Sequence, residues 1–248
     1  MGAKRLIKKK ILNMTKAHFN ILTLFPDMFP GMLGSSLAGK ALERGDWSFN
    51  AVNIRDFAED THKTVDDTPY GGGAGMVIRA DVIEKALLSL PKPGRNIYLS
   101  PRGKVFNQAL AKELSAEDSL TLLCGRYEGV DQRVLDAHDF EEISVGDYVL
   151  SGGEPAALIL MDACIRLLSG VMGNNDTADN ESFGINTGGL LEYPHYTRPS
   201  EWVDANGKIH TVPEVLKNGN HAHIEAWQRE ESLKITEIRR PDLLKKTT

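Results

Sequence analysis

The stretch that decides the fold reads LTLLCGRYEGVDQRVLDA (120–137) and then EEISVGDYVLSGGEPAALI (141–159). Each half begins as an apolar strand, enters a glycine-rich loop and continues as a helix. A glycine at a strand end lets the backbone approach a ligand closely, and the first N–H groups of the next helix point back toward that ligand. Two ordinary βα turns have the same pattern, so neither loop alone distinguishes a turn from a ligand site.

A third loop of this kind lies earlier, in Tyr98-Leu-Ser-Pro-Arg-Gly-Lys104, where the strand NIYLS (96–100) ends. Parallel α/β sheets bind their ligands at the carboxyl ends of strands. Three strand-end loops in succession therefore predict one binding cavity.

Strands and helices alternate around these loops. Further strands are expected at HFNILTLFP (18–26) and SFNAVNIRDF (48–57), and helices at 28–44 with glycine interruptions, 80–90, 106–115 and 130–138. This alternation predicts an α/β fold with a mostly parallel, helix-covered sheet. The segment PAALILMDACIRLLSG (155–170) is apolar nearly all round, which predicts a helix buried in the core or at a subunit interface.

The composition changes after residue 170, where GNNDTADNESFGINTGG (173–189) is polar and has no strong periodicity. We expect a flexible interdomain linker over 171–192. Short helical stretches follow it and predict a second, helical domain over 193–248. The expected organisation is completed by a basic leader over 1–17 and the α/β domain over 18–170.

Charge and cysteine content narrow the class of protein. The formal net charge is −5, but residues 1–16 contain six of the 29 basic side chains, so the rest carries 23 basic and 34 acidic groups, a net −11. Global charge therefore does not indicate a nucleic-acid partner. Cys124 and Cys164 both sit in apolar runs, which indicates a reducing compartment. Because no apolar run has the length of a membrane span, we expect a soluble cytoplasmic protein.

Several familiar site motifs are missing. The sequence contains no G-x-G-x-x-G, P-loop, G-x-S-x-G or H-E-x-x-H motif, and its histidines have no metal-ligand spacing. The glycine run Tyr70–Met76 comes nearest to a phosphate loop, but no lysine follows it, and a flexible hinge would have the same composition.

Longer strings identify a family. LFPDMF (24–29), HKTVDDTPYGGGAGM (62–76), YLSPRG (98–103), LLCGRYEGVD (122–131), SVGDYVLSGGE (144–154) and PHYTRP (194–199) occur in this order. Together they closely resemble the bacterial tRNA (guanine-N1)-methyltransferases, a branch of the SPOUT methyltransferases. The resemblance runs from about residue 18 to the C-terminus.

The resemblance implies more than the residues alone predict. It implies a SPOUT-type parallel sheet with a deep trefoil knot, a small all-helical C-terminal domain, and a homodimer with active sites at its interface. It also implies that S-adenosyl-L-methionine methylates N1 of guanosine 37 in tRNA, after guanosine 36, and that Mg²⁺ supports activity. Topology rules alone would have predicted an unknotted sheet.

The same resemblance assigns cofactor-binding residues to the three loops: Tyr98, Leu99, Ser100, Pro101, Gly103, Gly125, Tyr127, Glu128, Val145, Gly146, Asp147, Tyr148, Val149, Leu150, Gly152 and Gly153. Main-chain amides and apolar walls suit a planar adenine, and a carboxylate such as Glu128 suits the positive sulfonium. Taken without the resemblance, Tyr98, Leu99 and Leu150 are more typical of core positions than of a ligand site.

Methylation at guanine N1 requires a base, because N1 carries a proton in the neutral ring. The negative charge that then develops on O6 favours a nearby cation. By resemblance these roles fall to Glu181 and Arg166, with Asp179 as the alternative base. The family pattern has Asp at the position of Glu181, so here the side chain is one methylene longer.

The resemblance also assigns tRNA contacts, to Asp66, Gly71, Gly72, Gly73, Gly75, Arg126, His195 and Arg198. A target guanine leaves the stack more easily in a loop than in a duplex. Two alternatives remain open at this point. One is a non-catalytic RNA-binding protein that retains the cavity, and the other is a SPOUT methyltransferase with another RNA target.

Overall fold

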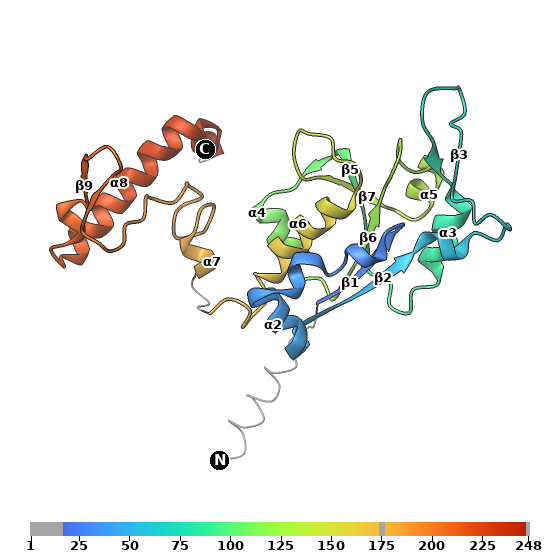
Figure 1. The fold of residues 1–248 in the computed structure, drawn as a ribbon, viewed down its shortest axis with the longest axis horizontal. Helices are drawn as coiled ribbons and strands as arrows, with labels where there is room; N and C mark the ends of the chain where they lie inside the picture. Colours follow the sequence, from blue (N-terminus) through green and yellow to red (C-terminus); the bar gives the residue numbers. More distant parts are fainter. Residues whose placement is uncertain (1–16, 174–176, 247–248) are drawn as a thin grey trace, which may run out of the picture. The chain divides into compact units, whose positions relative to one another are not determined.

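A computed structural model describes residues 17–173 and 177–246 of the protein (Figure 1). These residues form two compact units, divided after Gly173. All but the last residue of the predicted basic leader lies outside the described residues.

The first unit is built on a five-stranded sheet of β1 (Ala17–Thr23), β2 (Trp47–Asn53), β5 (Arg95–Val105), β6 (Ser119–Cys124) and β7 (Glu141–Ser144). The strand order is β2-β1-β6-β5-β7, and every neighbouring pair is parallel. The predicted parallel sheet is therefore confirmed. Since all five strands run the same way, their carboxyl ends meet at one edge.

Helices cover both faces of this sheet (Figure 1). Those on one face are α2 (Ser36–Arg44), α4 (Gln108–Leu114) and α6 (Glu154–Ile165), and those on the other are α3 (Ala80–Leu88) and α5 (Gln132–Ala137). The strands alternate between the two resulting cores. Ile97 and Leu99 of β5 pack with the α6 side, whereas Tyr98 between them packs with the α3 side.

Two elements differ from the sequence-based expectation: one helix is interrupted, and one strand is shorter. The helix expected over 28–44 is broken into η1 (Pro26–Met28), η2 (Gly31–Gly34) and α2, because Gly31 has a φ of +54° and Ser35 is extended. The strand expected to begin at residue 141 stops at Ser144, before the alternating pattern of residues 145–150. Gly146 takes a φ of +154° there, and the chain leaves the sheet as a loop.

The second unit contains α7 (Thr177–Asn180), β8 (Glu201–Val203), β9 (Ile209–Thr211), η4 (Glu214–Leu216), α8 (His221–Arg239) and η5 (Pro241–Lys246). The expectation of an all-helical C-terminal domain is wrong, because β8 and β9 form an antiparallel hairpin. Asp204 closes its turn by accepting the N–H groups of Asn206 and Lys208, and Trp202 stacks on His210 across the strands.

The described part of the predicted linker, residues 177–192, contains α7 and a series of hydrogen-bonded turns. Phe183 N–H donates to the Leu190 carbonyl at 2.9 Å, and Leu191 N–H donates to Thr236 Oγ1 of α8 at 3.0 Å. These bonds attach the segment to the second unit. Among the described helices, none has the length and apolar composition needed to cross a bilayer.

Candidate functional site

A cavity of about 410 Å³ opens beside the central part of β5 and at the carboxyl ends of β6 and β7. These strands are neighbours in the sheet, so the loops after β6 and β7 meet there, as the sequence predicts. The third predicted loop, 98–104, is instead part of β5, which continues to Val105 and shifts its register against β7 between Leu99 and Lys104. The lining residues are Tyr98–Arg102, Gly125–Val130, Gln132, Ile143–Gly146, Tyr148–Gly153 and Ala156.

Most residues that the resemblance assigned to a cofactor line this cavity, with two exceptions. Gly103 lies behind the wall, where a Cβ would come within 2.4 Å of the Ile143 nitrogen, so it keeps β5 close to β7. Asp147 is exposed and lies outside the lining.

The lining also includes residues that the sequence analysis did not assign to the cavity: Arg102, Gly129, Val130, Gln132, Ile143, Ser144, Ser151 and Ala156. Arg102 donates to both Gln132 and Glu142, each at 3.1 Å, and so joins β5 to α5 and β7. The sequence contained one signal for the role of Arg102, which is its place within the YLSPRG string. Gln132 reaches the cavity from a helix, which only the folded structure shows.

Two glycines allow the cavity loops to approach the sheet. A Cβ on Gly125 would lie 2.8 Å from the Tyr98 hydroxyl oxygen, and a Cβ on Gly153 would lie 2.7 Å from Cys124 Cα. Gly153 N–H also donates to the Gly125 carbonyl at 2.9 Å. The loops after β6 and β7 therefore meet backbone to backbone. Burial raises the pKa of the Tyr98 hydroxyl, so this side chain stays neutral near pH 7.

The glycine run 71–75 is held at the edge of the cavity. Its flanking strands β3 (Asp66–Asp67) and β4 (Val77–Ile78) form a small antiparallel sheet. Glu128 N–H donates to the Met76 carbonyl at 3.0 Å, and the Glu128 side chain lies where a Cβ on Gly75 would be. Arg126 therefore lines the cavity and Gly75 lies next to its wall, whereas Asp66 and Gly71–Gly73 are not part of the lining.

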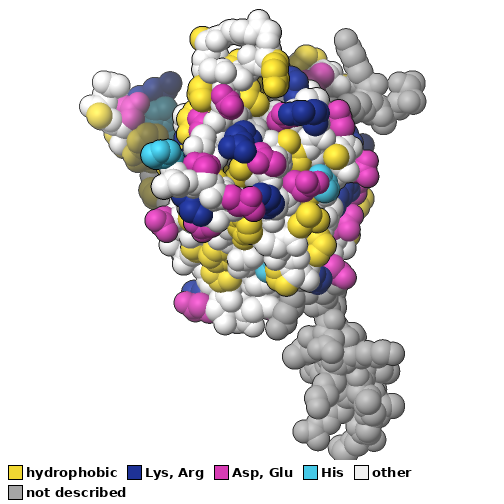
Figure 2. Space-filling model, turned by 90° about the vertical axis from the view of Figure 1, so that its right-hand side faces the viewer, with side chains coloured by type: hydrophobic (Ala, Val, Ile, Leu, Met, Phe, Trp, Pro, Cys, Tyr) yellow, Lys and Arg dark blue, Asp and Glu magenta, His cyan; other side chains and the backbone are white. Residues whose placement is uncertain are grey.

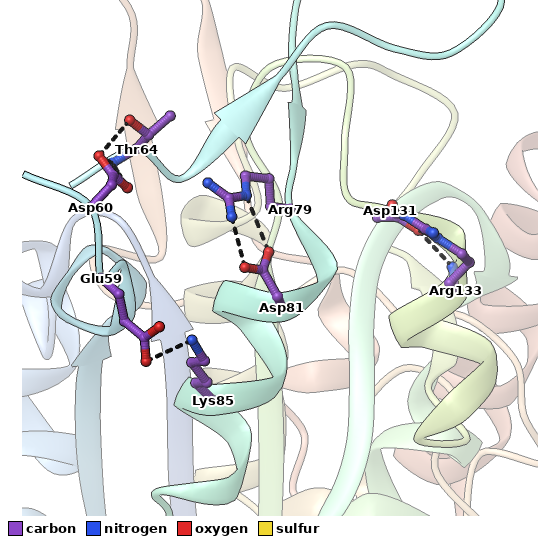
Figure 3. A network of polar contacts seen from close by, with 8 residues as sticks. All are labelled: Glu59, Asp60, Thr64, Arg79, Asp81, Lys85, Asp131 and Arg133. Atoms are coloured by element: carbon purple, nitrogen blue, oxygen red, sulfur yellow. Dashed lines mark hydrogen bonds and ion pairs between the residues drawn. The ribbon is translucent and has the colours of Figure 1, made fainter. Parts of the chain in front are cut away.

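Ion pairs stiffen the base of this region (Figure 3). Arg79 pairs with Asp81 at 2.7 Å at the start of α3, and Arg133 pairs with Asp131 at 2.7 Å at the start of α5. The Thr64 hydroxyl donates to Asp60 and lowers the pKa of that carboxyl. Because these groups are largely exposed, we assign them a local ordering role rather than a large share of stability.

Among the side chains that line the cavity, Arg126 contacts several groups of the surrounding protein. Its Nε lies 2.9 Å from Oε2 of Glu154, its Nη1 donates to the Ser151 carbonyl at 3.2 Å, and its guanidinium lies over the Phe25 ring at 4.4 Å. The side chain of Glu154 is fully buried. Sequence analysis assigned Arg126 to tRNA and did not single out Glu154.

Arg166 and Glu181 belong to different units. Arg166 follows the last residue of α6 and is half-buried. Glu181 is also half-buried, and its carbonyl accepts the Gly184 N–H at 2.9 Å and the Thr187 hydroxyl at 3.2 Å. The Asp179 carbonyl accepts the Asn186 N–H at 2.9 Å. Asp179, in α7, and Glu181, just after it, are therefore both held by main-chain bonds to residues 184–187.

The remaining predicted tRNA contacts, His195 and Arg198, are exposed in the second unit. His195 pairs with Glu192 at 3.0 Å and packs against Tyr193.

On the face of the molecule drawn in Figure 2, basic and acidic side chains are interspersed rather than separated. Such a surface favours contacts through a few local groups over a broad basic patch.

Within the described residues, neither the cysteines nor the potential metal ligands indicate a second reactive or metal-binding site. Cys124 and Cys164 are buried and unpaired, and burial raises the pKa of the Cys164 thiol to about 12. The pKa of Cys124 is raised well above its ordinary value for the same reason. Over residues 17–173 and 177–246, no three His, Cys, Asp or Glu side chains gather in a way that could hold a metal ion.

Comparison with known proteins gives a consistent result. The family model described as tRNA (Guanine-1)-methyltransferase TrmD matches residues 17–246. A tRNA (guanine-N(1)-)-methyltransferase of Rhodospirillum rubrum is 59% identical over 224 residues, 90% of each chain. Proteins of the same name from Rhizobium etli and from Wolbachia pipientis subsp. Culex pipiens are each 57% identical, over 91% and 90% of this chain and 94% and 95% of theirs. The chain therefore belongs to the tRNA (guanine-1)-methyltransferase family.

Proposed function

We propose that this protein methylates N1 of guanosine 37 in tRNAs that have guanosine at position 36, with S-adenosyl-L-methionine as the methyl donor. The observation that carries the proposal is the cavity formed by β5 and the loops after β6 and β7, in a chain whose family match spans residues 17–246. A volume of about 410 Å³ is within the range of small-molecule sites.

The residues of the cavity fit the proposed donor. Gly125 and Gly153 let the loops after β6 and β7 approach each other closely, because a Cβ on either would collide with protein atoms. Main-chain amides in such glycine-rich loops suit the edge of an adenine ring. The Glu128 carboxylate in the wall complements a positive sulfonium. When bound, S-adenosyl-L-methionine supplies an electrophilic methyl group.

The chemical roles follow from the substrate. Guanine N1 becomes nucleophilic once its proton is removed, and we assign this proton transfer to the carboxylate of Glu181, with Asp179 as the alternative. Arg166 is assigned to stabilise the negative charge that develops on O6. Mg²⁺ remains part of the proposal as a requirement for activity, to be tested by titration with EDTA.

The proposal also includes the finer features of the family. These are a deep trefoil knot in a SPOUT-type sheet, a homodimer, and a cytoplasmic location alongside tRNA. Exposed apolar side chains support the homodimer. Phe25, Met28 and Met32 of the η1–η2 region and Ile159 of α6 are all exposed, and Leu158 of α6 packs against Gly31 of η2. An apolar surface of this kind is typical of a subunit interface.

Two measurements test the proposal. In isothermal titration, S-adenosylhomocysteine is expected to bind, whereas ATP, GTP and NAD are not. In single-turnover reactions, a tRNA transcript with G36 and G37 is expected to gain one methyl group, which mass spectrometry maps to G37. The matched control transcript carries adenosine at position 37. Absence of S-adenosylhomocysteine binding would contradict the proposal, and a methyl group at another nucleotide would reassign the target.

A further inference from the structure

Glu154 is a buried carboxylate that the sequence analysis did not identify. It occupies the first position of α6, next to the cavity residues Gly153 and Ala156, and its side chain has no solvent exposure. Oε1 accepts a hydrogen bond from the Thr23 hydroxyl at 2.7 Å, and Oε2 lies 2.9 Å from Arg126 Nε. A fully buried carboxylate is rare unless its charge is compensated. Glu154 thus joins the end of β1, the loop after β6 and the start of α6.

One oxygen of Glu154 accepts a hydrogen bond from Thr23, whereas the other forms an ion pair, since Oε2 lies 2.9 Å from Arg126 Nε without a hydrogen bond between the two atoms. The Thr23 hydroxyl oxygen already accepts the Phe25 N–H at 2.9 Å, so the single proton of this hydroxyl is free to point at Glu154. A glutamine amide at this position would keep the shape of the side chain and the bond from Thr23, but it would have no charge to pair with the Arg126 guanidinium.

Arg126 connects Glu154 to the Ser151–Gly152 segment of the cavity wall. While Nε faces Glu154, Nη1 donates to the Ser151 carbonyl at 3.2 Å, and the guanidinium lies on the Phe25 ring. The side chain also passes over Gly152, where a Cβ would come within 2.3 Å of Nε. A planar guanidinium makes these contacts together, whereas a single ammonium group has no such geometry. Ser151 and Gly152 are part of the cavity lining.

We propose that Glu154 is a positioning residue, which orients Arg126 so that Arg126 holds the Ser151–Gly152 segment in place as a wall of the methyl-donor cavity. The inference rests on the proposed function, since it assigns the cavity to S-adenosyl-L-methionine. It differs from a purely stabilising role in one respect. Glu154 acts on cofactor affinity through Arg126, so its effect should disappear when Arg126 is absent.

The test is a double-mutant cycle read out by isothermal titration with S-adenosylhomocysteine at 25 °C. Glu154→Gln is expected to weaken binding by about tenfold, because it removes the charge that pairs with Arg126 and holds its guanidinium in place. Arg126→Ala is expected to weaken binding to a similar extent. In the Arg126→Ala background, Glu154→Gln should cause no further loss, because the residue through which it acts is missing.

The control for stability is Ile165→Val, at the far end of α6 and likewise fully buried. It should lower the melting temperature and leave the affinity for S-adenosylhomocysteine unchanged. If Glu154→Gln does not fold, as judged by circular dichroism, Thr23→Val takes its place, since it removes the hydroxyl that donates to Glu154 and keeps the side-chain shape. A smaller loss of affinity that again disappears with Arg126→Ala is then expected.

Two results would overturn the inference. The first is wild-type affinity in folded Glu154→Gln, and the second is an equal loss of affinity with Arg126 present or absent. The wild-type protein is measured alongside. If it does not bind S-adenosylhomocysteine, the proposed function fails, whereas normal wild-type binding together with a silent Glu154→Gln contradicts the positioning role alone.

Discussion

Substitution of Gly153 by alanine should weaken cofactor binding through a backbone clash. The new Cβ would lie 2.7 Å from Cys124 Cα and 3.0 Å from Gly125 N, and both are main-chain atoms of the sheet end that cannot rotate away. Forcing an extra methyl group into such a site costs about 1–3 kcal/mol. Relief of the clash moves the loop after β7 away from the loop after β6, which also breaks the bond from Gly153 N–H to the Gly125 carbonyl.

Because both loops line the cavity, part of this cost appears as lost affinity. We expect Gly153→Ala to raise the dissociation constant of S-adenosylhomocysteine about tenfold, equivalent to about 1.4 kcal/mol. The melting temperature should fall by about 2–4 °C for each kcal/mol of lost stability in a chain of this size. Isothermal titration and calorimetry measure the two effects.

The matched control is Gly173→Ala, where a Cβ would meet nothing within 4 Å. This variant should bind S-adenosylhomocysteine like the wild type. An unchanged dissociation constant in Gly153→Ala would refute the reasoning, because it would mean that the two loops do not need their close approach to form the site.

Three further predictions follow from the site and the core. Glu181→Gln should reduce methyl transfer by about two to four orders of magnitude without changing the affinity for S-adenosylhomocysteine, and normal turnover would shift the role of base to Asp179, tested with Asp179→Asn. Leu122→Ala, in the fully buried centre of β6, should destabilise the fold by about 2–5 kcal/mol in urea unfolding, and a smaller loss would show that the core collapses around the gap. Because burial raises the pKa values of Cys124 and Cys164, both thiols stay protonated at pH 8, so Ellman's reagent should react with neither until urea unfolds the protein.

The location of the cavity could be predicted because it depends on local signals. Gly125, Gly146 and Gly153 each follow an apolar strand, and parallel strands place such loops at one edge. The sequence did not predict that Gln132 lines the cavity or that Glu154 contacts Arg126. Both residues sit on helices, and only the folded structure brings these helices to the cavity. The buried pair of Glu154 and Arg126 joins residues 28 positions apart that no periodic pattern connects.

The second unit shows where sequence patterns were misread. The helical stretches that the sequence predicts after residue 211 led to an all-helical domain over 193–248, but Trp202–Val203 and Ile209–His210 alternate around the turn Asp-Ala-Asn-Gly (204–207) and form a hairpin. Asn-Gly between such runs is a hairpin signal that helical propensity obscured here. Conversely, the strand pattern of residues 145–150 had nothing to pair with beyond Ser144, because the chain turns away from the sheet at Gly146.

The pairing of β5 with β7 fixes the conformation of part of the cavity wall. The strand pairs with β7 through Leu99, interrupts its register, and pairs again with Ile143 through Lys104. Ser100–Gly103, which includes part of the cavity wall, is therefore anchored at both ends and has few alternative conformations to lose. A ligand that settles against this segment encounters a preorganised surface, so little of its binding free energy is spent on ordering the chain.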